Sequence, residues 1–593
     1  MIEEGLDTLR GGHPLKLSHF YDVAIFLFAA LLLLVVHTKI LIFDDAFVYF
    51  NYARNFAEGR PFAYDPRHIP SEGFTSLLYM LLLVPAELLR LNPIWISALI
   101  NLGALALSVV WLGQAARATG TLSERAATIF GLLLTILLLQ DYNIRSLALS
   151  GFEAILGVLC VAGVVISTAH ALDEKQSERA RRRWLSVFFV MAFLAHLVRP
   201  EYLLIGALGG ALLLWRSSDR IAVLRRAAIF VLIMLSYYLL KLAIFGDLFP
   251  TGFYRKVRAS ALGESYVQAW LNDYQSLLPL ALIAFVGLSI ALRKRAVWLA
   301  LMAGGATLIV LFYTQTVPLS AVWHRFLVMP IWAGYALCAL GAAWLLDVLA
   351  RRSKVKAAWI AEAGRAIFLC LTPLLVISNA GMSPAQAWHA ISEEGVLNLQ
   401  SRAERALHEN LYLQLGWHWR SQLESPEALT VAYNEAGALP YALGSRFIDL
   451  YGLAEVEIAH LFSLSDGEVK TARYIAYVLA QQPSVLIMLN YGEAEQAVWY
   501  GFADPHSPFQ GAPPAAIYEA YYAYGLRYAC SVNHWGLKLH ILIWRDSPHG
   551  AQALSEAFCG HPSAYRFPDG LIVETEGKAI HFPPLVIGTA TAS

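Results

Sequence analysis

Long apolar runs, separated by short polar or charged segments, occupy most of residues 1–379. Many of them approach the roughly 20 apolar residues that a helix needs to cross about 30 Å of hydrocarbon. The runs lie at 22–43, 74–91, 94–116, 125–140, 154–170, 184–198, 202–215, 227–245, 277–292, 297–317, 326–349 and 357–378. This pattern predicts a mainly α, polytopic membrane protein.

Clusters of Lys and Arg between the runs predict the orientation of the helices, because cytoplasmic loops are rich in these residues. The clusters lie at 175–183, 216–226, 293–295 and 351–356. If all of them face the cytoplasm, the following segments lie on the outer face: 141–153, 199–201, 246–276 and 318–325.

If the run at 74–91 crossed the membrane, the basic cluster at 175–183 would lie on the outer face. We therefore expect that this run does not cross. It also contains Pro85 and Glu87, which suits a helix near the membrane surface. About 11 spans then remain, with the N-terminus in the cytoplasm. The run at 22–43 is too long for a signal-peptide core of about 7–15 residues, so we expect an uncleaved first span.

Residues 380–593 have a different pattern, in which short β-type runs and polar helical stretches alternate with turn signals. The β-type runs are 429–433, 447–450, 484–489 and 537–544, and the helical stretches include 399–415 and 469–481. This mixture predicts a small α/β domain on the outer face. We therefore divide the chain into a transmembrane domain at 1–379, with an outer loop at 44–93, and an extracytoplasmic domain at 380–593.

The composition supports a membrane protein and excludes several other classes. Of the 593 residues, 58% are hydrophobic and 15% charged, and the mean hydropathy is +0.52. Soluble chains have about 45–50% apolar and about 25% charged residues, so disorder, collagen and coiled coil are excluded. The net charge of zero gives no general attraction to nucleic acid. Residues 380–593 nevertheless hold 11 Lys and Arg against 21 Asp and Glu, so the outer part is acidic and the membrane part basic.

Carboxylates occur at several expected outer ends of the spans, namely at Asp44, Asp45, Glu72 and Glu153. Asp44 and Asp45 directly follow the first run, where two adjacent carboxylates are costly unless they are solvated or used. Either they end a helix in water, or one is a general base whose pKa is raised by partial burial and by its charged neighbour. Glu72 and Glu153 return to the same face, which favours a shared functional site.

Basic side chains also occur on the outer face, where Lys and Arg are normally scarce. They are Arg199 beside Glu201, Lys256 in the group at 255–258, and His324 with Arg325. Arg199 either pairs with Glu201 or binds a phosphate, and the group at 255–258 binds either lipid phosphates or a substrate phosphate. A carboxylate base with phosphate-binding cations suits the transfer of a sugar from a lipid phosphate to an acceptor hydroxyl.

In their order along the chain, these residues resemble the GT-C superfamily of polyprenyl-phosphate-sugar-dependent glycosyltransferases, and most of all the mycobacterial-type terminal arabinofuranosyltransferases. The elements that carry the resemblance are Asp44-Asp45-Ala46-Phe47, Glu72-Gly73-Phe74-Thr75, Ser150-Gly151-Phe152-Glu153, Arg199-Pro200-Glu201, Pro250-Thr251 with Lys256, Arg325-Phe326-Leu327, Gly437-Ala438-Leu439-Pro440-Tyr441 and Ile448-Asp449-Leu450-Tyr451-Gly452-Leu453. The chain departs from the family pattern at Phe152, where the family has Leu, and before Thr251, where the family has Asn.

The resemblance implies a GT-C fold and an inverting transfer from a polyprenyl-phosphate-linked sugar, with arabinofuranose as the best match. The acceptor would be a hydroxyl of a cell-envelope glycan, lipid or protein at the outer face of a bacterial inner membrane. Asp44 would be the base, and Asp45 would orient the acceptor or tune Asp44. Substrate binding is assigned to Glu72, Glu153, Arg199, Glu201, Lys256, His324 and Arg325. No cofactor is expected; Asp44, Asp45 and Glu153 offer ligands for a divalent ion, but metal-free catalysis is preferred.

Other functions share some of these features. A transporter or flippase of a lipid-linked sugar would also need outer cations, but it should show repeated halves and interrupted helices, which the sequence lacks. A GT-C enzyme that uses a hexosyl polyprenyl phosphate would show the same residues. A glycan-binding protein would use the tyrosines between 518 and 528 as a platform, although their spacing is more typical of a packed helix.

Cys530 and Cys559 are the only cysteines of residues 380–593. The expected topology places both outside the cytoplasm, where disulfides persist. Cys530 should end an aromatic-rich helical run, and the strand at 537–544 lies between the two cysteines. We expect a disulfide, with Cα atoms about 4.4–6.8 Å apart, and two free thiols are the alternative.

Overall fold

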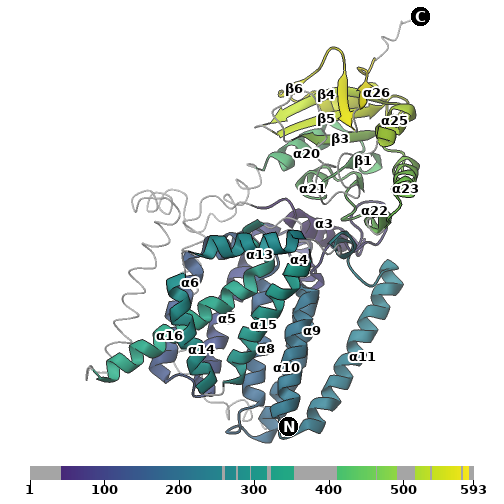
Figure 1. Cartoon of the computed structure of the whole chain (residues 1–593). Coiled ribbons are helices and arrows are strands. Elements are labelled where there is room, and N and C mark those ends of the chain that lie inside the picture. Colours follow the sequence, from purple (N-terminus) through teal and green to yellow (C-terminus); the bar gives the residue numbers. More distant parts are fainter. Residues whose placement is uncertain are drawn as a thin grey trace, which may run out of the picture. The chain divides into compact units, whose positions relative to one another are not determined.

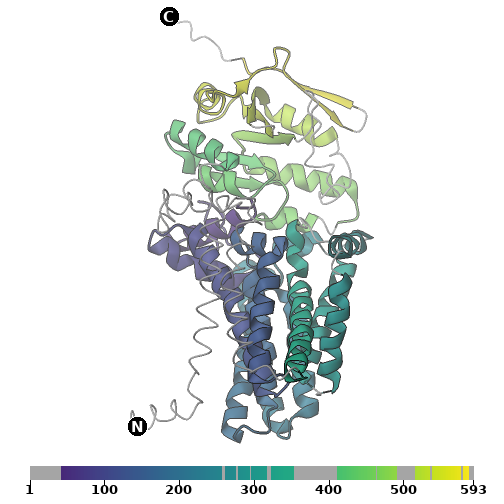
Figure 2. The same cartoon turned by 90° about the vertical axis from the view of Figure 1, so that its left-hand side faces the viewer.

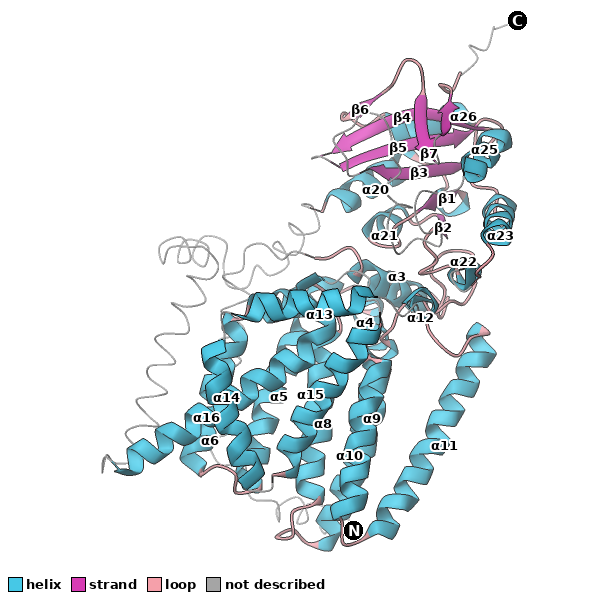
Figure 3. Cartoon of the chain, in the orientation of Figure 1, coloured by secondary structure: helices cyan, strands magenta, loops and turns pink. Residues whose placement is uncertain are grey.

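The computed structural model describes residues 42–256, 261–275, 278–293, 296–316, 322–352, 410–461, 464–490, 515–534, 537–575 and 578–586. The chain is mainly helical, with 68% helix, and the strands of the described part all lie after residue 429 (Figure 1; Figure 3). The run expected to span at 357–378, and all of the first run except Ile42 and Phe43, lie outside the described residues.

Two compact units make up the chain. Unit 1 consists of residues 1–41, 94–236 and 259–402, and unit 2 consists of residues 42–93, 237–258 and 403–593. The expected outer loop therefore belongs to the same unit as the C-terminal part of the chain. The boundary expected between residues 379 and 380 lies outside the described residues, and the division at that point stays a prediction.

The helices of unit 1 are α5 (Pro93–Ala118), α6 (Glu124–Gln140), α7 (Tyr142–Leu149), α8 (Ala154–Ala171), α9 (Glu178–Val198), α10 (Leu203–Arg216), the first part of α11 (Arg220–Phe245), α13 (Ala261–Tyr274), α14 (Leu278–Arg293), α15 (Val297–Gln315) and α16 (Val328–Arg352). Most of them follow the apolar runs, whereas α7 and α13 lie in segments that the sequence predicts on the outer face. α8 packs on α9, and α16 packs on both α6 and α14, so that long helices run side by side (Figure 2). α13 packs on α15 and crosses the direction of these helices (Figure 1).

Within the described residues, five helices are long and apolar enough to cross a membrane, namely α5, α8, α11, α15 and α16 with its preceding turn. α6 and α7 add a sixth span if they are counted together, although they bend by 78° at their junction. Asp141 lies at that junction and caps α7, because its side chain accepts a hydrogen bond from the N–H of Ile144. The chain is a multi-pass membrane protein, and the total of 11 spans stays a prediction.

The apolar run at 74–91 forms α4 (Leu77–Leu88), which packs on α3 (Ala46–Ala57) in unit 2. Ser76 caps α4 by accepting a hydrogen bond from the N–H of Tyr79. The helix has 12 residues. At 1.5 Å per residue such a helix is about 18 Å long, short of the about 30 Å of hydrocarbon that a span must cross. This length agrees with the expectation that the run does not cross the membrane.

The C-terminal part of unit 2 contains a six-stranded sheet in the order β2-β1-β3-β5-β4-β6 and a separate pair, β7 and β8. The strands are β1 (Thr430–Tyr433), β2 (Arg446–Asp449), β3 (Val485–Asn490), β4 (Leu526–His534), β5 (Leu537–Trp544), β6 (Ala564–Tyr565), β7 (Leu571–Thr575) and β8 (Lys578–Phe582). The helices are α20 (Leu411–Gln422), α21 (Ala438–Leu443), α22 (Val456–Leu461), α23 (Gly467–Ala480), α25 (Ala515–Tyr524) and α26 (Ala551–Cys559). β1, β2, β3 and β5 occupy the strand positions that the sequence predicts, and β1 runs parallel to β2 and β3.

The prediction of a helical run up to Cys530 is wrong for the residues after Tyr524. α25 ends at Tyr524, and Gly525 follows it with a φ of 103°, a backbone angle that other residues rarely adopt. Cys530 lies inside β4, whose backbone pairs with β5. Pairing with a distant strand therefore overrides the local helical pattern. Tyr518 and Tyr521 on α25 are buried, as expected for a packed helix rather than a sugar platform.

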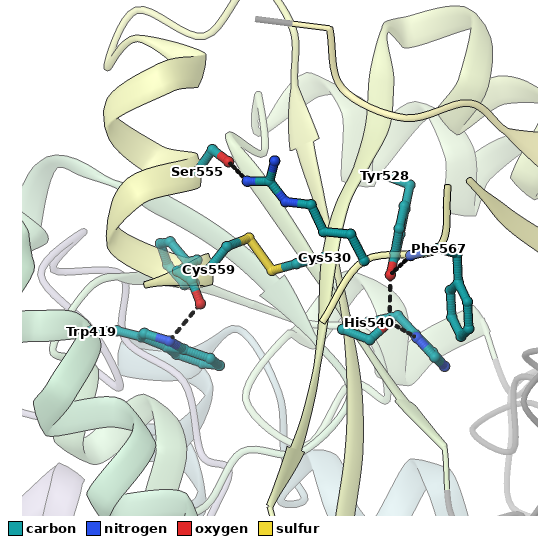
Figure 4. Close-up of a disulfide and its surroundings, with 10 residues drawn as sticks. Trp419, Tyr528, Cys530, His540, Ser555, Cys559 and Phe567 are labelled. Carbon is teal, nitrogen blue, oxygen red and sulfur yellow. Dashed lines mark hydrogen bonds between the residues drawn. A yellow bond between two sulfur atoms is a disulfide. The ribbon is translucent and has the colours of Figure 1, made fainter. Parts of the chain in front are cut away.

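The disulfide between Cys530 and Cys559 is confirmed, with Cα atoms 5.9 Å apart (Figure 4). The bridge joins β4 to the last residue of α26. Beside it, the indole N–H of Trp419 donates a hydrogen bond of 3.0 Å to the carbonyl of Phe558 (Figure 4). α26 is thus attached both to the sheet and to α20.

Candidate active site

Asp44 lies two residues before α3 and contacts the first residue of α21 in the C-terminal part of unit 2. Its Oδ1 accepts a hydrogen bond of 2.8 Å from the backbone N–H of Ala438. Burial raises the pKa of Asp44 well above its ordinary value, and the nearby charges of Glu435 and Asp45 add to this effect, while the Ala438 N–H opposes it. A raised pKa makes the Asp44 carboxylate a stronger base than an ordinary aspartate.

Gly437, the residue before α21, allows the start of this helix to approach Asp44 closely. A Cβ atom at this position would overlap the Asp44 carboxylate, so only glycine fits without displacing it. Next to this contact, Arg54 of α3 donates a hydrogen bond of 2.9 Å to the carbonyl of Tyr441 and lies 4.3 Å from the centre of its ring. The Asp-Asp-Ala-Phe and Gly-Ala-Leu-Pro-Tyr elements, which are far apart in the sequence, therefore meet in unit 2.

Glu72 forms a buried ion pair with Lys241, a partner that sequence reasoning missed. The Glu72 Oε2 atom lies 2.6 Å from Nζ of Lys241 on α11, and both side chains are buried. Burial raises the pKa of Glu72 to about 7, although Lys241 lowers it. Lys241 lies within the apolar run at 227–245, and a lysine inside such a run is the signal that could have found it.

Other elements of the resemblance hold the backbone around Glu72. Thr251 donates two hydrogen bonds to the Glu72 carbonyl, of 3.1 Å from its N–H and 3.0 Å from its hydroxyl. The Thr251 hydroxyl also contacts the carbonyl of Leu453. The N–H of Gly73 donates a hydrogen bond of 3.0 Å to the hydroxyl of Tyr52 on α3. Segments that are distant in the sequence thus hold the backbone at Glu72 and Gly73.

A cavity of about 370 Å³ lies in unit 2 beside α3. Its polar lining includes three arginines and three carboxylates, namely Arg54, Arg60, Arg420, Glu58, Asp65 and Glu427. Ser445 also lines it, and its buried hydroxyl has no hydrogen-bond partner within the described part of the chain. Because the charges balance, the cavity suits a neutral, hydroxyl-rich ligand better than an anion.

In unit 1, three expected elements meet at Arg199, at the start of the turn between α9 and α10. Its guanidinium lies 2.7 Å from Glu153 Oε1 and 2.6 Å from Glu201 Oε1. It also donates a hydrogen bond of 3.0 Å to the hydroxyl of Tyr313 and lies 4.7 Å from the ring centre of Phe326. The order of the elements along the chain could not show that all three contact the Arg199 side chain.

The ion pair with Glu201, one of the two alternatives for Arg199, is present, and Glu153 provides a second carboxylate. All three side chains are buried, at 4% to 7% exposure. Burial alone would raise the pKa of Glu201, but Arg199 and the hydroxyl of Tyr313 outweigh it, and the pKa lies below its ordinary value. Arg199 is therefore neutralised within the protein, and a phosphate-binding role for it stays a prediction.

His324 and Arg325 lie in the turn at Val322–Leu327, directly before α16. The Nε2 atom of His324 lies 2.6 Å from Oδ2 of Asp273. The guanidinium of Arg325 lies 4.5 Å from the ring centre of Phe152, the residue that stands where the family has Leu. His324 has a φ of 50°, a strained angle for a residue with a side chain, and such strain is often found at functional sites.

The candidate residues therefore form two sets, one in each unit. Unit 2 holds Asp44, Asp45, Glu72 and Lys256, and unit 1 holds Glu153, Arg199, Glu201, His324 and Arg325. Lys256 ends α12 (Thr251–Lys256), but its side chain lies outside the described part, so its role stays a prediction. Among the described residues, no three His, Cys, Asp or Glu side chains lie close enough together to hold a metal ion.

Comparison with known proteins supports the fold. The structure of ArnT from Cupriavidus metallidurans bound to undecaprenyl phosphate aligns with 89% of this chain and 98% of that chain, with a TM-score of 0.53 and 14% identity. The Archaeoglobus fulgidus oligosaccharyltransferase tethered to an acceptor peptide aligns with 89% of this chain and 74% of that chain, with a TM-score of 0.50 and 12% identity. Both are glycosyltransferases of the GT-C type, and at these identities the likeness shows the fold alone.

Sequence comparison adds little about activity. Residues 398–531 match a family described as a domain of unknown function (DUF8728). No functionally curated protein matches the chain in sequence.

Proposed function

We propose that this protein is a polyprenyl-phosphate-dependent glycosyltransferase in which Asp44 is the general base. The observation that carries the proposal is a carboxylate with a raised pKa, held in place by Ala438, in a chain with the GT-C fold. The undecaprenyl phosphate bound to ArnT supports a lipid phosphate as the leaving group. From the family resemblance, we favour arabinofuranose as the sugar, and a glycan, lipid or protein of the bacterial cell envelope as the acceptor at the outer face of the inner membrane.

In the proposed reaction, the acceptor oxygen attacks C1 of the sugar from the side opposite the lipid phosphate. Asp44 takes the proton of the acceptor hydroxyl while the new C1–O bond forms. The bond between C1 and the phosphate oxygen breaks, and its electron pair leaves with the polyprenyl phosphate. This single displacement inverts the configuration at C1. Asp45, whose charge helps to raise the pKa of Asp44, tunes the base.

The leaving phosphate gains negative charge, so cations near it lower the barrier. We propose this role for Lys256 and for Arg325, and we propose His324, the neighbour of Arg325 in the sequence, as a further substrate contact. Arg199 is already paired with two carboxylates, and we propose that it positions the turn that it occupies. Glu72, buried against Lys241, similarly orders the loop that carries it.

The cavity beside α3 supports a sugar-containing acceptor. Asn51 and Asn55 line it together with arginines and carboxylates, which are side chains that hydrogen-bond well to sugar hydroxyls. Trp417, also in its lining, offers a flat apolar surface to a sugar ring. The unpartnered hydroxyl of Ser445 provides a further hydrogen-bonding group.

The test is sugar transfer by the purified full-length chain from an arabinofuranosyl polyprenyl phosphate, with cell-envelope glycan as acceptor and release of polyprenyl phosphate as readout. Asp44→Asn preserves an oxygen that accepts the hydrogen bond from Ala438, so the fold should persist. Loss of the base should lower kcat by about 10²–10⁴-fold. In the wild type, kcat/KM should fall as the pH drops through the raised pKa of Asp44, because only the ionised form accepts a proton. Normal turnover by Asp44→Asn would refute the assignment.

Controls separate this function from the alternatives. Asp546→Asn removes an exposed carboxylate from a surface pair with Arg545 and should leave transfer unchanged. Transfer from a hexosyl donor only would preserve the enzyme class and replace the sugar. Movement of lipid-linked sugar across a vesicle membrane without release of polyprenyl phosphate would indicate a flippase.

A further inference from the structure

A groove of about 730 Å³ lies between α9 and the first part of α11, within unit 1. One end is lined by Arg182, Arg225 and Arg226, together with Asp219. The remaining length is lined mainly by apolar side chains, namely Phe189, Val190, Phe193, Ile229, Phe230 and Ile233. The groove is therefore basic at one end and apolar along the rest.

The contacts of the three arginines show which of them can bind a negatively charged ligand. Arg182 pairs with Glu178 at 2.5 Å and with Asp219 at 2.9 Å, so carboxylates already neutralise it. Arg226 donates a hydrogen bond of 3.0 Å from α11 to the hydroxyl of Ser186 on α9 and so reaches across the groove. Arg225 is exposed beside it. A ligand at this end would therefore meet the guanidinium groups of Arg225 and Arg226.

The apolar walls of the groove are open to the surroundings. Val190 is 54% exposed and Ile229 is 51% exposed, although both lie in the middle of apolar helices. α11 is the least buried of the helices in the described part that are long enough to cross a membrane. An exposed apolar surface of this kind faces lipid in a membrane protein, and the adjoining arginines match an anionic headgroup.

We propose that this groove binds one anionic phospholipid of the cytoplasmic leaflet. Its phosphate lies between Arg225 and Arg226, and an acyl chain lies against Phe189, Phe193 and Phe230. The basic clusters at this end face the cytoplasm under the positive-inside rule, and that leaflet carries the anionic lipids to which basic pockets between helices bind. The apolar length of the lining favours a lipid over a soluble phosphate. The proposal is independent of the proposed glycosyltransferase function.

The test uses the purified full-length chain, freed of lipid in a zwitterionic detergent and examined by native mass spectrometry. Dioleoyl phosphatidylglycerol should bind as a single molecule more tightly than dioleoyl phosphatidylcholine, which has the same acyl chains. The double variant R225Q/R226Q should weaken phosphatidylglycerol binding by about 25-fold, since each arginine near an anionic lipid contributes about fivefold. Binding of phosphatidylcholine should not change.

Arg183→Gln is the matched control, because Arg183 neighbours Arg182 on α9, is exposed and does not line the groove. This variant should bind phosphatidylglycerol like the wild type. Equal affinity of the wild type for the two lipids, or an equal loss in Arg183→Gln, would overturn the proposal. So would tighter binding of undecaprenyl phosphate, or full competition by soluble glycerophosphate. If the double variant does not fold, the salt dependence of the wild type provides the test. Its affinity for phosphatidylglycerol should fall as the salt concentration rises, and its affinity for phosphatidylcholine should not.

Discussion

The buried pair of Glu72 and Lys241 leads to a prediction about stability that can be worked out from the structure. The two side chains are 5% and 7% exposed, and their charged atoms are 2.6 Å apart. Replacing Lys241 with Met removes the cation but retains an apolar chain of similar length. Glu72 is then left as a buried carboxylate without its partner, a change that typically costs about 3–5 kcal/mol.

The cost should depend on pH. The pKa of Glu72 in the folded protein is about 7, against an ordinary value of 4.5. A raised pKa of this size means that about 3 kcal/mol of stability, fully present below pH 4.5, is lost as the pH rises through about 7. Lys241 lowers this pKa, so Lys241→Met should raise it further. The variant should therefore be close to the wild type near pH 5, where Glu72 is protonated in both, and clearly less stable at pH 8.

Thermal unfolding of the purified chain in a mild detergent, measured at pH 5 and pH 8, tests this reasoning. The double variant E72Q/K241M has no buried charge at this position and should recover most of the stability that Lys241→Met loses at pH 8. Lys578→Met is the matched control, because Lys578 forms an exposed pair with Glu519 that should contribute less than about 1 kcal/mol. A loss of stability that is the same at both pH values, or a double variant less stable than Lys241→Met at pH 8, would refute the reasoning.

Other predictions concern the site, the bridge and the topology. Gly437→Ala should displace the Asp44 carboxylate and lower kcat by about 10²-fold while the melting temperature stays near that of the wild type, and full activity would contradict the close approach. Cys530→Ser should lower the free energy of unfolding by about 3–4 kcal/mol, and reductant should lower the melting temperature of the wild type to the same value but leave the variant unaffected. Tags at residues 178 and 590 should report opposite sides of the membrane, with 178 in the cytoplasm, and accessibility from one side only would contradict the expected orientation.

Several features could be predicted from the sequence because they depend on local chemistry. The apolar runs predict where α5, α8, α11 and α15 lie, since a span needs a continuous apolar stretch. The short runs of β-type residues likewise predict β1, β2, β3 and β5. The disulfide between Cys530 and Cys559 could be predicted because the expected outer location of residues 380–593 favours disulfides and only two cysteines occur there.

The partners of the charged residues could not be predicted, because they depend on which segments pack together. Glu72 could be named as a candidate from the sequence, but its pairing with Lys241 from a distant apolar run could not. For Arg199 the sequence left two alternatives, an ion pair with Glu201 or a phosphate ligand. The structure shows the pair with Glu201 and a second pair with Glu153 from another element. A pKa is set by burial and by neighbouring charges, so the raised pKa of Asp44 also needs the folded loop around Ala438.

Residue chemistry along the chain is enough to predict a membrane protein, the chemical types of its candidate site residues and the order in which they occur. The strand β4 could be seen only in the folded structure. Its backbone forms hydrogen bonds with β5, whereas the sequence predicted a helical run up to Cys530. The folded structure also decided that Arg225 and Arg226 meet one end of an apolar groove. The physical reason is the same in each case: hydrophobicity and charge belong to each residue, whereas burial, ion pairing and strand pairing belong to contacts between segments far apart in the chain.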